Sequence, residues 1–367
     1  AGRARAYTVL VRSETAHGTT EDMQSRLWEN VPGVRFRGAI HESIEASPEV
    51  SLAVVSSTSV VVEHLGYRPE VMESRQKLRR NSTMLTAAIA SDPEDAYLRY
   101  KAAQQALADG DYATAVQEGE AALRISDSGS ASRGPLGPSN VADTYRTLIA
   151  AHLALGDADD AVRVGDRGVQ ACPDHAPLRT QHGLALLAGR EPARALEAFR
   201  EARSRREAPL VGAVDRASVG WRALYGMGEA YLELGRPADA RTALTQALID
   251  APGNVVVTRA LALAEEGAGD LQGAYDRLDA VVRQHPTDVE LRRALAGLLR
   301  RADEGAEAVR ILAPLLDGET VPAEVYDDLA LALDAAGEAS DAENARQIAQ
   351  RLREGVAMGG GDGESDQ

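Results

Sequence analysis

The feature that most constrains this chain is an alanine that recurs near the start of an amphipathic helical segment. Successive members lie 46, 34, 45, 34, 34 and 34 residues apart, so the period is 34 with two insertions, of 12 and 11 residues. The seven positions are Ala115, Ala161, Ala195, Ala240, Ala274, Ala308 and Ala342. A period of this length predicts one helical hairpin per repeat, because a single unit cannot bury its apolar face and stacks on its neighbours.

A second position, twelve residues before each alanine, is also usually small. It holds Ala103, Ile149, Gly183, Gly228, Ala262, Ala296 and Ala330. Since a large side chain would hold two helices apart, small residues at both positions allow the helices of a hairpin to cross closely. A glycine precedes the second helix in five repeats, at Gly110, Gly156, Gly235, Gly269 and Gly337. Three repeats close with a proline, which cannot continue a helix, at Pro173, Pro252 and Pro286.

The fourth repeat carries the pattern most fully. Its residues are Trp221, Leu224, Gly228, Tyr231, Gly235, Ala240, Ala247 and Pro252. They resemble the tetratricopeptide (TPR) repeat, and the resemblance covers about residues 94–354. It implies a mostly α-helical solenoid of about seven hairpins. The insertions at 127–138 and 205–219 are rich in Gly, Ser, Pro or Asp, which is typical of surface loops.

Composition limits the expected cellular compartment and the expected classes of binding partner. The 367 residues include one cysteine, Cys172, which excludes an internal disulfide framework and a multi-cysteine metal site. A net charge of −16 repels nucleic acids and acidic membrane surfaces. No apolar run approaches the ~20 residues that span a bilayer. We therefore expect a cytoplasmic protein whose partners are proteins or peptides, without nucleic acid and without a transmembrane segment.

The first 67 residues follow another pattern. Short β-branched or alternating runs at 7–11, 25–29, 34–40 and 59–63 predict strands, and a helix is expected from Pro69 to about Ala90. Such strands leave open sheet edges and an uncovered apolar face, so we expect further chain to complete the sheet. The expected domains are 1–67, β-rich and incomplete; 68–92, a connecting basic helix; 93–354, the repeats; and 355–367, a disordered tail rich in Gly and acidic residues.

Four stretches of this N-terminal part resemble a known family. They read Arg-Leu-Trp-Glu-Asn at 26–30, Val-Arg-Phe-Arg-Gly-Ala-Ile-His-Glu at 34–42, Val-Glu-His-Leu-Gly-Tyr at 62–67 and Lys-Leu-Arg-Arg-Asn at 77–81. They are similar to the closing stretch of a bacterial family 2 glycosyltransferase domain that continues into TPR repeats. The resemblance implies a GT-A type domain that uses a nucleotide-sugar donor and Mg²⁺ or Mn²⁺. It also implies that the donor-binding half lies outside this chain, so we expect this chain alone to bind no cofactor and to be inactive.

The resemblance favours His41 and Glu42 as catalytic residues, with His41, or more weakly His64, as a metal ligand. A neutral imidazole can bind a divalent ion, and a carboxylate can take a proton from an acceptor. The alternative is structural: the pair satisfies a strand edge, and His64 packs at the corner between sheet and helix. The only Asp-x-Asp, Asp157 to Asp159, lies in a repeat turn, where we expect the acids to cap the next helix.

The repeats offer a different site. The fifth position of the first helix, which usually faces the concave surface of such an array, holds an arginine in repeats two, five and six and a tyrosine in repeat four. With one neighbouring arginine, the candidate groove residues are Arg146, Arg222, Tyr225, Arg259 and Arg293. Guanidinium groups in a row suit an extended ligand that carries carboxylates. The alternative is that they pair internally with Glu229, Glu266 or Glu290.

Two functions therefore compete. In the first, the chain is the C-terminal portion of a glycosyltransferase whose repeats hold an acceptor or partner. In the second, it is a non-catalytic TPR adaptor for protein–protein interaction.

Overall fold

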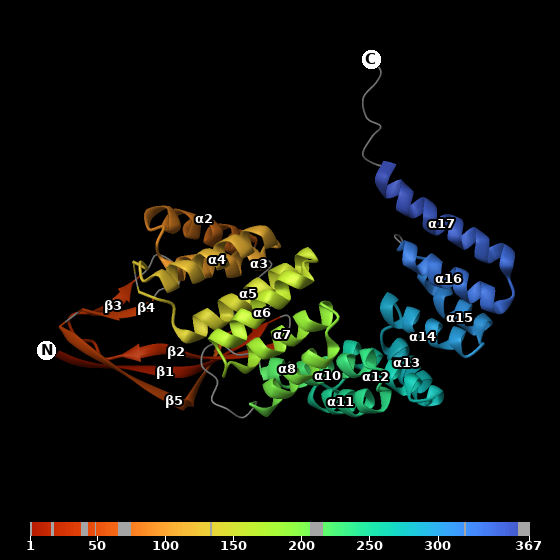
Figure 1. The fold of residues 1–367 in the computed structure, drawn as a ribbon, viewed down its shortest axis with the longest axis horizontal. Helices are drawn as coiled ribbons and strands as arrows, with labels where there is room; N and C mark the ends of the chain where they lie inside the picture. Colours follow the sequence, from red (N-terminus) through yellow and green to blue (C-terminus); the bar gives the residue numbers. More distant parts are fainter. Residues whose placement is uncertain are drawn as a thin grey trace, which may run out of the picture. The chain divides into compact units, whose positions relative to one another are not determined.

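The computed structural model describes residues 2–15, 18–37, 43–47, 49–64, 75–132, 134–205, 216–318 and 321–358 (Figure 1). The chain divides into two compact units, Ala1–Ala230 and Tyr231–Gln367. Each unit has its own core, centred on residues such as Leu148 and Phe199 in the first and Leu295 and Leu312 in the second.

The first unit begins with β-strands, as the sequence predicts. Strand β1 (Gly2–Thr15) lies between β2 (Gly18–Trp28), which is antiparallel to it, and β5 (Val50–His64), which is parallel to it. Strands β3 (Val34–Arg37) and β4 (Ser43–Ala46) form a separate antiparallel pair. Strands β1 and β5 are longer than the sequence predicts, because they pair along nearly their whole lengths.

The three-stranded sheet is open at both edges among the described strands. Its central strand is well covered: Ala4, Ala6 and Val9 are buried. In contrast, neighbouring residues of β5 are exposed, Val54 by 59% and Val55 by 42%, and neighbours on a strand point to opposite faces. That further chain completes this sheet stays a prediction. An open sheet of this kind is not specific to one fold family.

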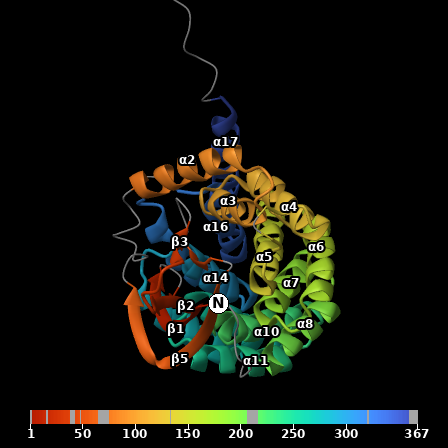
Figure 2. The same cartoon turned by 90° about the vertical axis from the view of Figure 1, so that its left-hand side faces the viewer.

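Helical hairpins make up the rest of the first unit. Successive helices from α3 to α8 lie side by side in chain order (Figure 2). In this unit the helices are α2 (Arg75–Ser91), α3 (Ala96–Ala108), α4 (Tyr112–Ser128), α5 (Pro138–Leu155), α6 (Ala158–Ala171), α7 (Ala176–Ala188), α8 (Pro192–Ser204), α9 (Arg216–Val219) and α10 (Trp221–Glu233), whose last turn enters the second unit. The short helix α9 forms inside the second insertion, where the sequence predicts only a loop.

The second unit continues the helical pattern. Its helices are α11 (Pro237–Asp250), α12 (Val255–Gly267), α13 (Leu271–Gln284), α14 (Val289–Arg301), α15 (Gly305–Leu312), the 3₁₀ turn η2 (Ala313–Leu315), α16 (Ala323–Ala336) and α17 (Ala339–Met358). Within the described ranges, six of the seven hairpins that the period predicts lie inside one unit and are observed: α3–α4, α5–α6, α7–α8, α12–α13, α14–α15 and α16–α17. Helix α17 runs four residues past the expected boundary at 354. No described helix has the length and apolar character needed to cross a membrane.

The small residues that define the period lie at buried helix contacts, as the sequence predicts. All seven recurring alanines, from Ala115 to Ala342, are 0% exposed. At Gly183 on α7, an added Cβ would lie 2.6 Å from Cε1 of Phe199 on α8, closer than side chains pack. The helices of this hairpin therefore cross at a distance that only a residue without a side chain allows.

The turns inside the hairpins share one left-handed residue. The five predicted turn glycines have positive φ, as at Gly156 (φ 82°) and Gly269 (φ 86°). The same conformation occurs at Arg190 (φ 60°) and Asp303 (φ 61°), each 34 residues after one of these glycines. The hairpin geometry therefore imposes this conformation even on residues with a side chain, at a cost in backbone strain.

Aspartates at the start of the second helix behave differently from repeat to repeat. Asp111 and Asp270 cap α4 and α13 by accepting the backbone N–H of Thr114 and Gly273. Asp157 occupies the same N-cap position of α6, as predicted, yet its side chain accepts no capping hydrogen bond from the described chain. The predicted position is confirmed, with Asp157 at the N-cap and Asp159 in the first turn of α6, but the predicted capping by the Asp157 side chain is wrong.

Candidate functional site

The second unit contains a hollow of about 310 Å³ between α12, α14 and α16. Leu263, Ala294 and Gly297 supply apolar lining, and the polar lining is mostly arginine. Its charged residues are Arg259, Arg293, Arg300, Arg301, Glu290 and Asp328. Four guanidinium groups against two carboxylates make the hollow basic, although the whole chain carries a net charge of −16.

Two of the predicted groove arginines meet in this hollow. Arg259 lies on α12 and Arg293 on α14, and both pair with Glu290: its Oε2 is 3.1 Å from Nη1 of Arg259, and its Oε1 is 3.0 Å from Nη1 of Arg293. The Nε of Arg293 also donates to Oδ2 of Asp328 on α16, at 2.5 Å. The internal pairing that the sequence left open is thus present. It holds the two guanidinium groups in fixed positions and links three successive repeats, through α12, α14 and α16.

Two further arginines of the hollow differ in their partners. Arg301 donates two hydrogen bonds to Glu266, from Nε at 2.5 Å and Nη2 at 2.8 Å, and this bonding raises the pKa of Arg301. The guanidinium group of Arg300, a half-buried residue, makes no hydrogen bond or ion pair with the part of the chain that the structure describes. A guanidinium group without a carboxylate can accept one from a ligand.

Sequence reasoning missed Arg300 and Asp328. The repeat register carried a signal for both, since Arg300 lies 34 residues after Glu266 and Asp328 lies 34 residues after Ala294. Ala294 lines the hollow, and Glu266 pairs with Arg301 of its lining, so the register places both missed residues near this face.

The other groove candidates belong to the first unit. Arg146 on α5 donates to Asp143 at 2.8 Å, and its Nε is buried without a hydrogen-bond partner among the described residues. Arg222 on α10 stacks over the ring of Trp221, at 5.2 Å from the centroid, and Tyr225 lies one turn further along the same helix. The structure therefore brings Arg259 and Arg293 together within the second unit, whereas Arg146, Arg222 and Tyr225 belong to the first unit.

For the catalytic and metal-ligand candidates of the N-terminal part, the structure describes only the backbone of His64. His41 and Glu42 lie outside the described residues. His64 is the last residue of β5, opposite Ser13 of β1, and its side chain is also outside the described set. Its neighbour Glu63 pairs with Arg12 at 3.1 Å on the surface. The described residues of this sheet thus bring no catalytic group together, and the roles of His41, Glu42 and His64 stay predictions.

A second hollow, of about 340 Å³, lies between α2, α3 and α4. Leu85 and Ile89 supply apolar lining, and Asp109, Asp111 and Glu118 supply negative charge. Its acidic rim repels carboxylates, so it suits a different ligand from the arginine-lined hollow.

Comparisons with known proteins agree with this fold. Two family models described as tetratricopeptide repeat match the chain, one over residues 77–130 and 180–255 and the other over 266–327. A TPR repeat-containing protein of Synechococcus elongatus is 32% identical over 115 residues, which are 29% of this chain and 28% of that protein. The chain thus aligns with less than a third of the length of this relative.

Solved structures show the same architecture. A tetratricopeptide repeat protein from Parabacteroides merdae has a TM-score of 0.54 at 16% identity, covering 70% of this chain and 92% of its own. PilW, a type IV pilus biogenesis factor, has a TM-score of 0.50 at 18% identity, covering 61% of this chain and 95% of its own. At such identities the likeness shows the fold alone. The family-model matches begin at residue 77, so they lend no support to a glycosyltransferase origin of residues 1–67.

Proposed function

The chain contains a tetratricopeptide-repeat array, and we propose that it is a scaffold that binds a protein partner without catalysing a reaction. The bound element is a peptide segment that carries a carboxylate, from an Asp or Glu side chain or from a chain terminus. The site is the arginine-lined hollow between α12, α14 and α16.

One observation carries this proposal: the guanidinium group of Arg300 has no ion-pair partner among the described residues, in a hollow where the neighbouring arginines are already fixed by acids. Glu290 and Asp328 hold Arg259 and Arg293 in place, so little side-chain entropy is lost when a ligand arrives. A carboxylate at Arg300 forms a forked, charge-assisted pair, while Leu263, which is 45% exposed, packs against an apolar neighbour in the ligand.

The net charge of the whole chain affects which carboxylate-containing ligands the hollow prefers. At −16 the protein repels a strongly acidic partner at long range, and the basic hollow attracts a carboxylate only at short range. The preferred ligand is therefore a segment with one or two carboxylates among apolar residues, rather than a long acidic run.

The test is a selection from a random peptide library, followed by affinity measurements with synthetic peptides. We expect enriched peptides that carry a carboxylate beside an apolar residue. The Arg300→Gln variant, which keeps length and hydrogen-bond donors but loses the charge, weakens their binding at least about tenfold, because a charge-assisted pair is worth ~1.5–3 kcal/mol. The matched control is Arg351→Gln on the exposed face of α17.

Two results contradict the proposal. One is a selection that enriches no sequence. The other is an enriched peptide whose affinity is the same for wild type, for Arg300→Gln and for the double variant Arg259→Ala, Arg293→Ala. Equal binding to all of these proteins places the ligand outside the hollow.

A second proposal rests on the sequence resemblance alone. In it, residues 1–67 belong to a family 2 glycosyltransferase domain, and the nucleotide sugar with Mg²⁺ or Mn²⁺ binds only when the remainder of that domain is present. The scaffold proposal has the better support, because the matching families and structures are repeat proteins and the described sheet residues assemble no catalytic group.

A further inference from the structure

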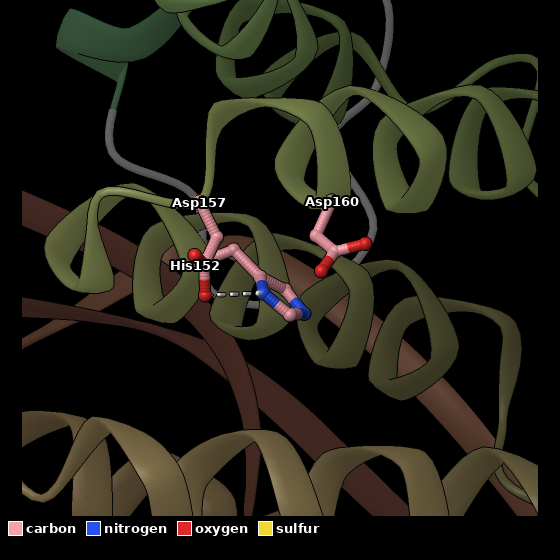
Figure 3. A group of neighbouring side chains, drawn as sticks. All are labelled: His152, Asp157 and Asp160. Carbon is pink, nitrogen blue, oxygen red and sulfur yellow. Dashed lines mark ion pairs between the residues drawn. The ribbon is translucent and has the colours of Figure 1, made fainter.

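One cluster in the first unit is independent of the arginine-lined hollow. His152 lies in the last turn of α5, and Asp157 and Asp160 lie at the start of α6 (Figure 3). One ligand atom from each residue can be chosen so that all three lie within 4.8 Å of one another. Figure 3 shows the imidazole pointing between the two carboxylates.

His152 differs from most residues at the equivalent position of the other repeats. The same position in five other repeats is apolar, and it holds Ala106, Leu186, Tyr231, Leu299 and Leu333. His152 is only 9% exposed, and its Nδ1 is buried without a hydrogen-bond partner among the described residues. A buried polar atom that is left unsatisfied costs about 1–3 kcal/mol, so its presence at an apolar position calls for a ligand.

Repeat five also has a polar residue at the position equivalent to His152, and there the chain supplies a hydrogen-bond partner. Its residue at this position is Glu265, which is buried and accepts two hydrogen bonds from Arg277, twelve residues later. In repeat two, the residue twelve positions after His152 is Val164, which offers no polar group. The protein chain therefore gives Glu265 a partner and gives His152 none at the equivalent place.

Asp157 supports the same conclusion from a different observation. Asp111 and Asp270 occupy its position in two other repeats and cap their helices, whereas the carboxylate of Asp157 turns toward His152. Its Oδ2 lies 3.9 Å from Nδ1 of His152, too far for a hydrogen bond. The side chain thus gives up a cap worth about 1 kcal/mol without gaining a hydrogen bond.

We propose that His152, Asp157 and Asp160 bind one divalent cation of the zinc class. One imidazole nitrogen and two carboxylate oxygens are a ligand set that Zn²⁺ accepts, with water completing a tetrahedron. Ligand atoms around tetrahedral zinc lie about 3.3 Å apart, which follows from metal–ligand distances of ~2.0 Å. Rotation of the two aspartates, whose side chains are 54% and 39% exposed, brings their oxygens that close while His152 stays anchored in the core.

The local charges can accommodate the ion. Arg163 pairs with Asp160, but its side chain is 69% exposed, and exposed ion pairs are weak enough for a divalent ion to displace. His152 lies at the C-terminal end of α5, where the helix dipole favours a cation. Because the ligands come from both helices of one hairpin, the bound ion joins α5 to α6 across the turn at Gly156.

The experiment uses the untagged 367-residue chain, stripped with a chelator and titrated with ZnCl₂ by calorimetry, with thermal unfolding followed in parallel. We expect one zinc ion per chain and a rise in Tm on binding. His152→Leu and Asp160→Asn each weaken zinc binding at least about tenfold. Leucine is the residue of repeats three, six and seven at this position, so His152→Leu retains the core. Asp159→Asn, an exposed neighbour on the same turn, is the control and binds zinc as wild type does.

Several results overturn the proposal. One is a wild-type protein that shows no saturable heat and no rise in Tm with ZnCl₂. Another is zinc binding that is unchanged in His152→Leu, which assigns the ion to other histidines. A third is equally tight binding of Mg²⁺ or Ca²⁺, which excludes the imidazole as a ligand. If the His152→Leu variant loses helical structure, the zinc titration of Asp160→Asn is the test, because this isosteric change leaves the core unaltered. Unchanged zinc affinity in Asp160→Asn then overturns the proposal.

Discussion

The left-handed turn residue of each hairpin gives a prediction whose size follows from the backbone alone. Gly269 lies between α12 and α13 with φ 86°, and an added Cβ would meet no atom within 4 Å. The change Gly269→Ala therefore introduces no clash. The turn hydrogen bonds, such as Gly269 N–H to the carbonyl of Glu266 at 2.9 Å, also do not involve the side chain. Only the conformational cost of a side chain at positive φ remains.

That cost can be worked out. An L-residue in the left-handed region loses about 1–2 kcal/mol, and the lower entropy of the unfolded alanine chain returns about 0.4–1 kcal/mol. The net destabilisation of Gly269→Ala is about 1 kcal/mol. The opposite change at the equivalent position of the next repeat, Asp303→Gly at φ 61°, stabilises the protein by about 0.5–1 kcal/mol for the same reason.

The assay is urea unfolding followed by circular dichroism at several protein concentrations. With an m-value of about 1–3 kcal/mol/M, a change of 1 kcal/mol moves the midpoint by about 0.3–1 M. The control is Gly355→Ala on α17, a helical glycine whose Cβ would also meet no atom within 4 Å. There the same chemical change favours the helix by about 1 kcal/mol, so the midpoint rises.

The reasoning fails if Gly269→Ala and Gly355→Ala move the midpoint in the same direction with unchanged m-values. It also fails if Asp303→Gly lowers stability, because then the turn at residue 303 is not strained.

Three further predictions concern other sites. Arg277→Met leaves the buried carboxylate of Glu265 without its partner and lowers the unfolding free energy by about 2 kcal/mol, less than for a fully buried pair because Arg277 is 31% exposed. The double change Glu265→Leu with Arg277→Ile, which copies repeat six, is near neutral in the same unfolding assay. Burial, and then the nearby charge of Arg146, lower the pKa of His175, whose Nδ1 caps α7 by accepting the N–H of Leu178. Its stabilising effect is fully present above its ordinary pKa of 6.5 and is lost as the pH falls from 6.5 through the lower folded value. His175→Asn keeps a cap and removes this loss, which Tm values above pH 6.5 and about one unit below it measure. Finally, we expect this chain alone neither to hydrolyse nor to transfer sugar from nucleotide donors with Mg²⁺ or Mn²⁺, and chromatographic detection of a product contradicts that expectation.

The sequence by itself determined the hairpin array. The buried alanines and the turn glycines act within a hairpin or between neighbouring hairpins, and their contacts recur with the repeat. Such contacts depend on spacing and residue size, and both can be read from the printed sequence. The β-rich start was predictable for a similar reason, because strand propensity is local. The strand order was not, because β1 pairs with β5 across some fifty residues, and propensity does not specify a partner.

The chemistry of the sites was decided by the tertiary structure. The register put Arg259 and Arg293 on one face, but only the folded chain shows that Glu290 joins them and that no acid within the described ranges pairs with Arg300. In the same way, the sequence placed Asp157 at a helix start, and the structure turned its carboxylate toward His152. The physical reason is that a charge interacts with whichever group lies within a few ångströms in space. In the hollow the next repeat supplies that group from about 30 residues away, and at His152 the turn of the same hairpin supplies it.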